Sequence, residues 1–107
     1  SEHRPGRGAW RDSLGRGDRM TRSEIYALID AERDQQALRW DGPHDWGSGD
    51  CSSPDVADIV KAAVLSEETG EVARAVLDGK NLRTELVQVA AVAVAWLESL
   101  PNVREAA

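Results

Sequence analysis

The chain has 107 residues and a mass of 11.7 kDa, which is the size of one small domain and too short for two. Its 13 basic and 19 acidic residues give a net charge of -6, which argues against a nucleic-acid polymer or an anionic membrane as the main partner, since both bind clustered Lys and Arg. The single cysteine, Cys51, excludes an intramolecular disulfide framework and any zinc site built from cysteines. The longest uncharged stretch, 86–97, is too short to span a bilayer, so a cytoplasmic protein is expected.

Residues 1–20 differ in composition from the rest of the chain. They carry five arginines against three acids, together with four of the nine glycines. So few apolar side chains cannot order such a segment by burial. Two interpretations stay open: an appended or alternatively translated leader, or a basic arm that docks on an acidic neighbour through Trp10. Residues 21–107 are the predicted helical domain.

The first predicted helix spans residues 21–40. Thr21 or Ser23 can cap its start and Glu24 suits its first turn. Apolar residues then recur at helical spacing. Dense glycine, proline and serine residues predict a loop over 41–53.

Two more helices are predicted after this loop. Ser53-Pro54-Asp55 predicts a helix start with proline at the first helical position, and Gly79 is placed to end that helix after Asp78. Asn81 is expected to cap a third helix that runs to residue 100, before Pro101. No segment has the alternation typical of a strand. The predicted class is all-α, with three main helices and an antiparallel hairpin of the second and third.

The third predicted helix is apolar on nearly every side over residues 86–97. A helix of this kind must be covered all round, and two other helices from a chain this short cannot do so. We therefore expect a homo-oligomer, a dimer or tetramer, to complete the helical bundle.

Polar residues gather beside this apolar run. Glu67, Glu68 and Glu71 are spaced so that they neighbour one another on one helical surface, and Glu85 and Gln88 lie one turn apart on the next helix. Glu71 lies eight residues before the glycine of the hairpin and Glu85 six after it, so a rise of about 1.5 Å per residue places them at similar depth. The four carboxylates are predicted to converge.

Converging carboxylates with few matching cations suit a hard divalent metal. Mg²⁺, with Mn²⁺ as an alternative, takes oxygen ligands and is commonly shared between carboxylates and substrate phosphates. The alternative is a solvated acidic face paired with nearby Lys and Arg side chains. The predicted metal ligands are Glu67, Glu68, Glu71, Glu85 and Gln88.

The segment Glu67-Glu68-Thr69-Gly70-Glu71, followed after thirteen residues by Glu85-Leu86-Val87-Gln88, resembles the E-E-x-x-E…E-x-x-D signature of the MazG-like, all-α nucleoside triphosphate pyrophosphohydrolases. The resemblance spans roughly residues 23–100, and the stretches 36–40 and 82–96 look closest to short single-domain members from phages and bacteria. E-E-x-x-E alone is a weak signal because acidic helices are common. Both motifs together, at this spacing and on a hairpin, are fairly specific.

This resemblance implies Mg²⁺-dependent cleavage of a (d)NTP or related nucleotide between its α- and β-phosphates, giving the monophosphate and pyrophosphate. By position, the catalytic and metal-binding roles fall on Glu67, Glu68, Glu71 and Glu85, and the metal activates the attacking water. Gln88 stands where the family pattern has an acid, so the site has one negative charge fewer. Its amide can coordinate weakly, or can be a buried group bonded to Glu85 or to backbone.

The nucleotide needs further contacts. Lys80 and Arg83 lie near the acids and can bind phosphates, while Gln36 and Trp40 lie where the resemblance places base recognition. Surface charge and ordinary packing are the alternatives for these side chains. The rival to the enzyme is a non-catalytic helical module that senses nucleotide or metal, or mediates an interaction, on the same scaffold.

Overall fold

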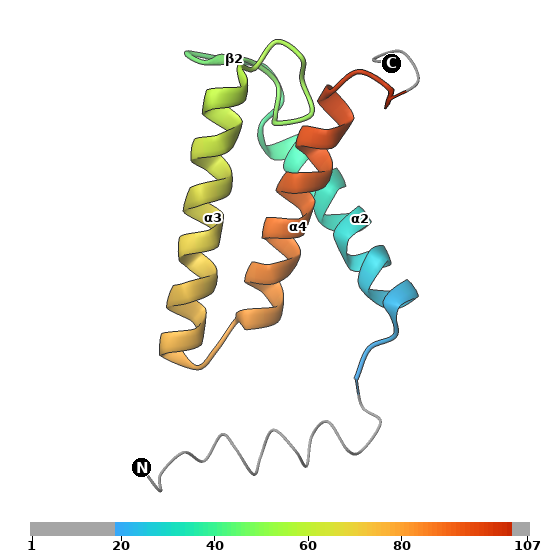
Figure 1. The fold of residues 1–107 in the computed structure, drawn as a ribbon, viewed down its shortest axis with the longest axis vertical. Helices are drawn as coiled ribbons and strands as arrows, with labels where there is room; N and C mark the ends of the chain where they lie inside the picture. The colour runs from blue at the N-terminus through green and yellow to red at the C-terminus, as the bar shows by residue number, and fades with distance from the viewer. Residues whose placement is uncertain (1–18, 104–107) are drawn as a thin grey trace, which may run out of the picture.

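The computed structural model describes residues 19–103, which form three long helices and a small hairpin (Figure 1). The predicted all-α class with three main helices is confirmed. Both interpretations of the N-terminal arm concern residues 1–20, of which residues 1–18 lie outside the described residues. In chain order the elements are α2 (Arg22–Arg39), β1 (Pro43–His44), β2 (Gly47–Ser48), α3 (Asp58–Asp78) and α4 (Leu82–Ser99).

Helix α4 lies between α2 and α3 and packs against both (Figure 1). The predicted antiparallel hairpin of α3 and α4 is confirmed. Gly79 ends α3 with a left-handed backbone, at φ 73° and ψ 25°. Asn81 takes the predicted cap position of α4, but its backbone is also left-handed, at φ 68°, and its side chain makes no cap hydrogen bond. The turn is therefore built from two left-handed residues, which Gly and Asn tolerate best.

The start of α3 differs from the prediction, because the helix begins at Asp58 and not at Pro54. Ser53 Oγ accepts the Asp55 amide hydrogen at 3.1 Å, and the Ser53 carbonyl oxygen accepts that of Val56 at 3.2 Å. These bonds close a tight turn in place of a helical turn. The Asp55 carboxylate in turn accepts the Ser48 amide hydrogen at 2.8 Å and so ties β2 to this turn.

The start of α2 agrees with the prediction. Thr21 Oγ1 accepts the Glu24 amide hydrogen at 3.2 Å, and Glu24 Oε1 accepts the Thr21 amide hydrogen at 2.7 Å. This reciprocal pair is a capping box. The helix ends at Arg39, one residue before the predicted end.

The loop after α2 contains the two short strands, which the sequence did not predict. Pro43 pairs with Ser48 and His44 with Gly47 in an antiparallel register. Gly47 has φ 125°, and a Cβ there would lie 2.7 Å from the Asp55 carbonyl oxygen. The pairing therefore depends on a glycine at this point and not on β-branched residues, which is why strand propensity gave no signal.

The core between the helices is small. Large apolar side chains remain open on the outer surfaces, with Ile59 76%, Leu77 86% and Leu97 67% exposed. No helix within residues 19–103 is long and apolar enough to cross a membrane. The buried apolar residues of the described chain are Val56, Ala75, Ala91, Val92 and Ala95.

Candidate functional site

The acids predicted to converge are electrostatically coupled between α3 and α4. Glu68 and Glu85 are half-buried, while Glu67 and Glu71 are exposed. Burial raises the pKa of the Glu68 carboxyl, and the negative charges of Glu85, Glu71, Glu67 and Glu32 raise it further. The other three predicted carboxylates are therefore close enough to Glu68 for their charges to act on it.

Gln88 lies between two of these acids, Glu68 and Glu85. In the amide orientation that satisfies its neighbours, Gln88 Nε2 donates to Glu68 Oε1 at 3.2 Å and to Glu85 Oε1 at 3.1 Å. The amide thus links a carboxylate of α3 to a carboxylate of α4. The alternative in which Gln88 is an amide bonded to Glu85 fits this geometry.

The chemistry of these donors suits Mg²⁺, which prefers carboxylate oxygens. Within residues 19–103, no ion pair with Lys or Arg neutralises any of the four acids. No three His, Cys, Asp or Glu side chains of this part of the chain are arranged as a ready metal cage. Mg²⁺ commonly keeps several waters and shares its coordination with substrate phosphates, so it does not require a complete cage of protein ligands.

A groove of about 390 Å³ opens between α2 and α4. Leu28, Ala31 and Val87 supply its apolar walls, and Arg83 brings a cation from the first turn of α4. Its volume is within the usual range for a small-molecule site. The polar residues that line it are Glu32, Gln35, Arg83 and Thr84.

Glu32 and Gln35 are site residues that the sequence reasoning missed. Glu32 Oε2 is buried and makes no hydrogen bond to the described residues. It lies 3.6 Å from Arg39 Nη2, which is an ionic contact longer than a hydrogen bond. The sequence does carry a signal for both residues. Glu32 and Gln35 follow Leu28 by four and seven residues, and these spacings place them on the same helical face as Leu28.

Of the predicted substrate contacts, only Arg83 lines the groove. Gln36 is 7% exposed, and its Oε1 accepts a hydrogen bond from Arg33 Nη1 at 3.3 Å. Lys80 is exposed in the turn between α3 and α4. The structure therefore places Gln35, and not Gln36, at the groove.

Trp40 belongs to an aromatic group at the far end of α2. The rings of His44 and Trp46 stack at 4.7 Å with 8° between their planes, and Trp40 lies 6.2 Å from Trp46. His44 Nε2 is 2.9 Å from the Trp40 carbonyl oxygen, which fastens the hairpin to the end of the helix. Trp40 therefore packs within the loop, away from the residues that line the groove.

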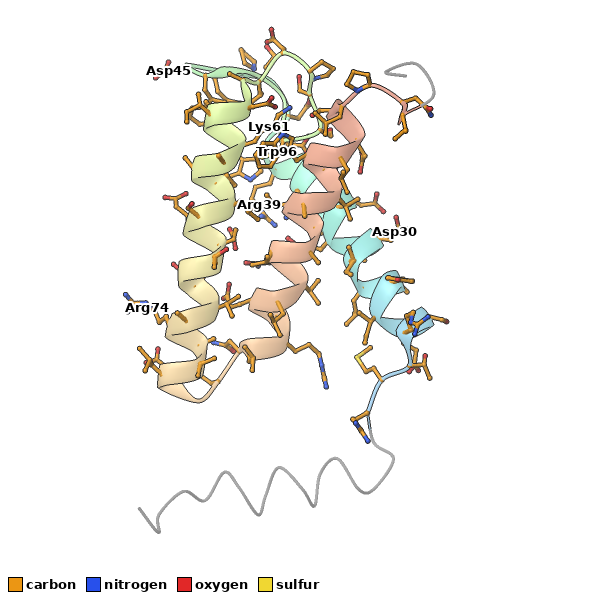
Figure 2. All side chains as sticks on the ribbon, in the orientation of Figure 1. Asp30, Arg39, Asp45, Lys61, Arg74 and Trp96 are labelled. Atoms are coloured by element: carbon orange, nitrogen blue, oxygen red, sulfur yellow. The ribbon has the colours of Figure 1, made fainter. Side chains whose placement is uncertain are left out.

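A second polar cluster lies at the loop end of the helices, where Figure 2 shows Lys61 and Trp96 near one another. Arg33 donates to Asp50 Oδ2 at 2.8 Å and to Glu98 Oε2 at 2.9 Å. Lys61, 1% exposed, donates to Ser99 Oγ at 2.7 Å. Here nearly every buried polar group has a partner from another element, which is the pattern of a structural network.

Comparisons of this chain with protein families, with curated proteins and with solved structures gave no match. The candidate function therefore depends on the acids, the groove and the motifs of this chain.

Proposed function

We propose that the protein is a Mg²⁺-dependent nucleotide pyrophosphohydrolase that cleaves a (d)NTP or related nucleotide to the monophosphate and pyrophosphate. The observation that carries this proposal is the half-buried Glu68, whose pKa is raised by burial and by four surrounding acids. A divalent cation would relieve that repulsion. The similarity of the two acidic motifs to those of MazG-like pyrophosphohydrolases supports the same reaction.

In this proposal Glu68 and Glu85 hold Mg²⁺, with Glu67, Glu71 and the Gln88 oxygen contributing from the rim. When bound, the metal neutralises charge on the phosphates and activates water for attack. Before a metal binds, the Gln88 NH₂ group keeps the two half-buried carboxylates together across the helix pair, and its oxygen would reach the metal only after the amide turns over. Arg83 binds a phosphate from the groove side, and Lys80 adds positive charge from the nearby turn.

Pyrophosphate release from a panel of NTPs and dNTPs, with and without Mg²⁺, tests the reaction. We expect pyrophosphate and monophosphate in equal amounts, and only with Mg²⁺ or Mn²⁺. Glu71→Gln should abolish turnover with the fold intact, whereas Asp30→Asn, an exposed change on α2, should leave it unaltered. Gln88→Asp should tighten Mg²⁺ binding and raise activity. Full activity in Glu71→Gln would refute the metal assignment.

One observation favours the rival function, a module that senses nucleotide or metal without turnover. The Gln88 amide donates hydrogen bonds to both Glu68 and Glu85. It therefore occupies space between the two carboxylates and partly offsets their charge, as a metal ion would. The same assay separates the two: binding of nucleotide without any pyrophosphate release supports the module.

We also propose that the protein is a homo-oligomer, a dimer or tetramer. Within residues 19–103 the buried apolar residues are only alanines and valines, while Ile59, Leu77 and Leu97 lie exposed on α3 and α4. Burial of such side chains against a second copy would supply the core that one chain lacks. Analytical ultracentrifugation at micromolar concentration tests this, and a monomer would contradict it.

A further inference from the structure

The side of α4 that faces away from its two neighbouring helices is apolar. Helix α4 packs against α2 and α3, and Ala91, Val92 and Ala95 are its buried residues (Figure 1). At about 100° per residue, the opposite side of the helix carries four apolar residues, which form the α4 stripe. Its two leucines are 49% and 67% exposed and its two alanines are half-buried. The residues of the α4 stripe are Leu86, Ala90, Ala93 and Leu97.

The spacing of the α4 stripe is that of a coiled-coil seam. Its successive members are separated by four, three and four residues. Apolar residues in this alternation insert as knobs into the holes of a second helix. Because α2 and α3 both pack on other sides of α4, the helix that would complete this seam is not among residues 19–103.

The order of side-chain sizes indicates that the second helix is α4 of another copy. Leucine, alanine, alanine and leucine read the same in both directions. In an antiparallel pair centred between residues 91 and 92, Leu86 lies opposite Leu97 of the second copy, and Ala90 lies opposite Ala93. A twofold axis makes each contact occur twice. The alanines allow the helices to approach closely at the centre, and the leucines fill the space at both ends.

Charges beside the α4 stripe are complementary in the same register. Arg83 and Glu98 lie on the flank of α4 next to α2, because Arg83 lines the groove there and Glu98 Oε2 accepts a hydrogen bond from Arg33. Equal flanks face one another across the twofold axis, and Arg83 is then within about 3 Å, along the helix axis, of the level of Glu98 of the second copy. A parallel pair would place these two charges about 22 Å apart along the axis.

We propose that two copies of this chain form an antiparallel dimer through the α4 stripe. The proposal rests on the proposed homo-oligomer, because it names the surface through which two copies meet. It leaves the acid cluster uncovered. Gln88, which contacts Glu68 and Glu85, follows Leu86 by two residues and therefore lies about 200° around the helix from it. Pairing and the acids use different sides of α4.

Analytical ultracentrifugation of the full chain and two matched variants tests this surface. Leu97→Glu places a carboxylate against Leu86 of the second copy, twice in each dimer. We expect the dimer dissociation constant to rise by about a hundredfold or more, as burial of unpaired charges predicts. Leu77→Glu makes the same change at an exposed leucine of α3 and should leave the dissociation constant unaltered. A dimer that persists in Leu97→Glu, or that is lost only in Leu77→Glu, would overturn the proposal.

A pair of opposite charges tests the antiparallel register and guards against a folding defect. Leu86→Lys combined with Leu97→Glu in one chain brings a lysine opposite a glutamate at both ends of the antiparallel pair. This double variant should dimerise about tenfold more tightly than Leu97→Glu alone, which is within the range of close charge pairs at interfaces. In a parallel pair, like charges would face one another. A double variant that dimerises no more tightly than Leu97→Glu, with helical circular dichroism intact in both, would overturn the register.

The proposed function and this inference fail separately. A dimer that Leu97→Glu does not weaken would keep the homo-oligomer and remove the α4 stripe as its interface. Dissociation by Leu97→Glu, in a protein that releases no pyrophosphate from any nucleotide, would remove the hydrolase and keep the interface.

Discussion

At the loop end of the molecule, Arg33 lies between Asp50 and Glu98, with side-chain exposures of 10%, 8% and 48%. Halfway along α3, Glu68 lies among Glu85 and the other acids, with an amide beside it and no Lys or Arg of residues 19–103 in an ion pair with it. Both groups bring charged side chains together from different helices. They differ in whether the charges cancel.

The two carboxyl pKa values show what this difference means. Burial alone would raise the pKa of Asp50, but hydrogen bonds from Ser52 and Arg33 outweigh it and hold the pKa below its ordinary value. The pKa of Glu68 is raised by burial and by its acidic neighbours. Folding therefore stabilises the charge of Asp50 and opposes that of Glu68. A balanced cluster stabilises the fold, whereas an unbalanced one is suited to a ligand of opposite charge.

The largest expected effect on stability is at the charge-balanced cluster of Arg33, Asp50 and Glu98. Arg33→Ala leaves the Asp50 carboxylate buried without its cation and should lower the free energy of unfolding by about 3 kcal/mol. Urea denaturation followed by circular dichroism measures this. Arg74→Ala provides the control, because Figure 2 shows Arg74 pointing away from α4 and the residue is exposed. A loss below 1 kcal/mol in Arg33→Ala, about the value of a surface pair, would remove the distinction between the clusters.

A variant of Lys61 tests whether a buried positive charge at the loop end of the molecule is needed for folding stability. It is buried, and its one hydrogen-bond partner among residues 19–103 is the neutral Ser99. Lys61→Met keeps the length of the side chain and removes the buried charge, so the protein should gain about 1 kcal/mol. A destabilisation of similar size would show that the ammonium group is stabilised by its surroundings. Lys80→Met, at an exposed position, serves as the control.

Gln88→Asp makes the unbalanced cluster more negative. The variant loses the bridging amide and adds a like charge, so without metal it should be less stable by about 1 kcal/mol. Millimolar Mg²⁺ should restore the loss, visible as a rise in Tm larger than that of the unaltered protein. Gln88→Leu removes the bridge without adding charge and should show no such Mg²⁺ response. If Gln88→Asp responds no more than Gln88→Leu, the acids do not bind Mg²⁺.

Glu68→Gln should stabilise the protein at pH 7 by about 0.5 kcal/mol, the upper end for relief of like charges on a helix. Because the folded pKa of Glu68 is raised, the unaltered protein loses stability as pH rises from the ordinary glutamate value near 4.5 through the folded pKa. Glu68→Gln should lack this loss. The lowered pKa of Asp50 acts oppositely, since its stabilisation is lost as pH falls below about 3.8, in both proteins. Urea melts from pH 3 to 7 separate the two windows.

Glu71→Gln should give the smallest change in stability, a gain of about 0.3 kcal/mol, because Glu71 is exposed and its repulsion is screened by water. A chemical melt at low ionic strength measures it, and added salt should reduce the gain. A loss of stability would mean that Glu71 has a structural partner, and the acid cluster would then be partly balanced.

The helices themselves follow from local rules. The capping box of Thr21 and Glu24 sets the start of α2, and the glycine at position 79 sets the end of α3, because each satisfies backbone groups by nearby residues alone. The spacing of Glu67, Glu68, Glu71 and Glu85 sufficed to place these acids on adjoining helices. Each of these features depends on residues within a few positions of one another, or on one simple hairpin.

The sequence by itself therefore determined the helical class, the α3–α4 hairpin and the group of acids beside it. Tertiary structure alone decided that Ser53-Pro54-Asp55 forms a turn and not the first turn of α3, because the Asp55 carboxylate accepts a hydrogen bond from the Ser48 amide across the loop. It also decided that Gln35 and Glu32, and not Gln36, line the groove. Which face of α2 meets α4 depends on the crossing of two helices distant in sequence, and no local propensity specifies that crossing.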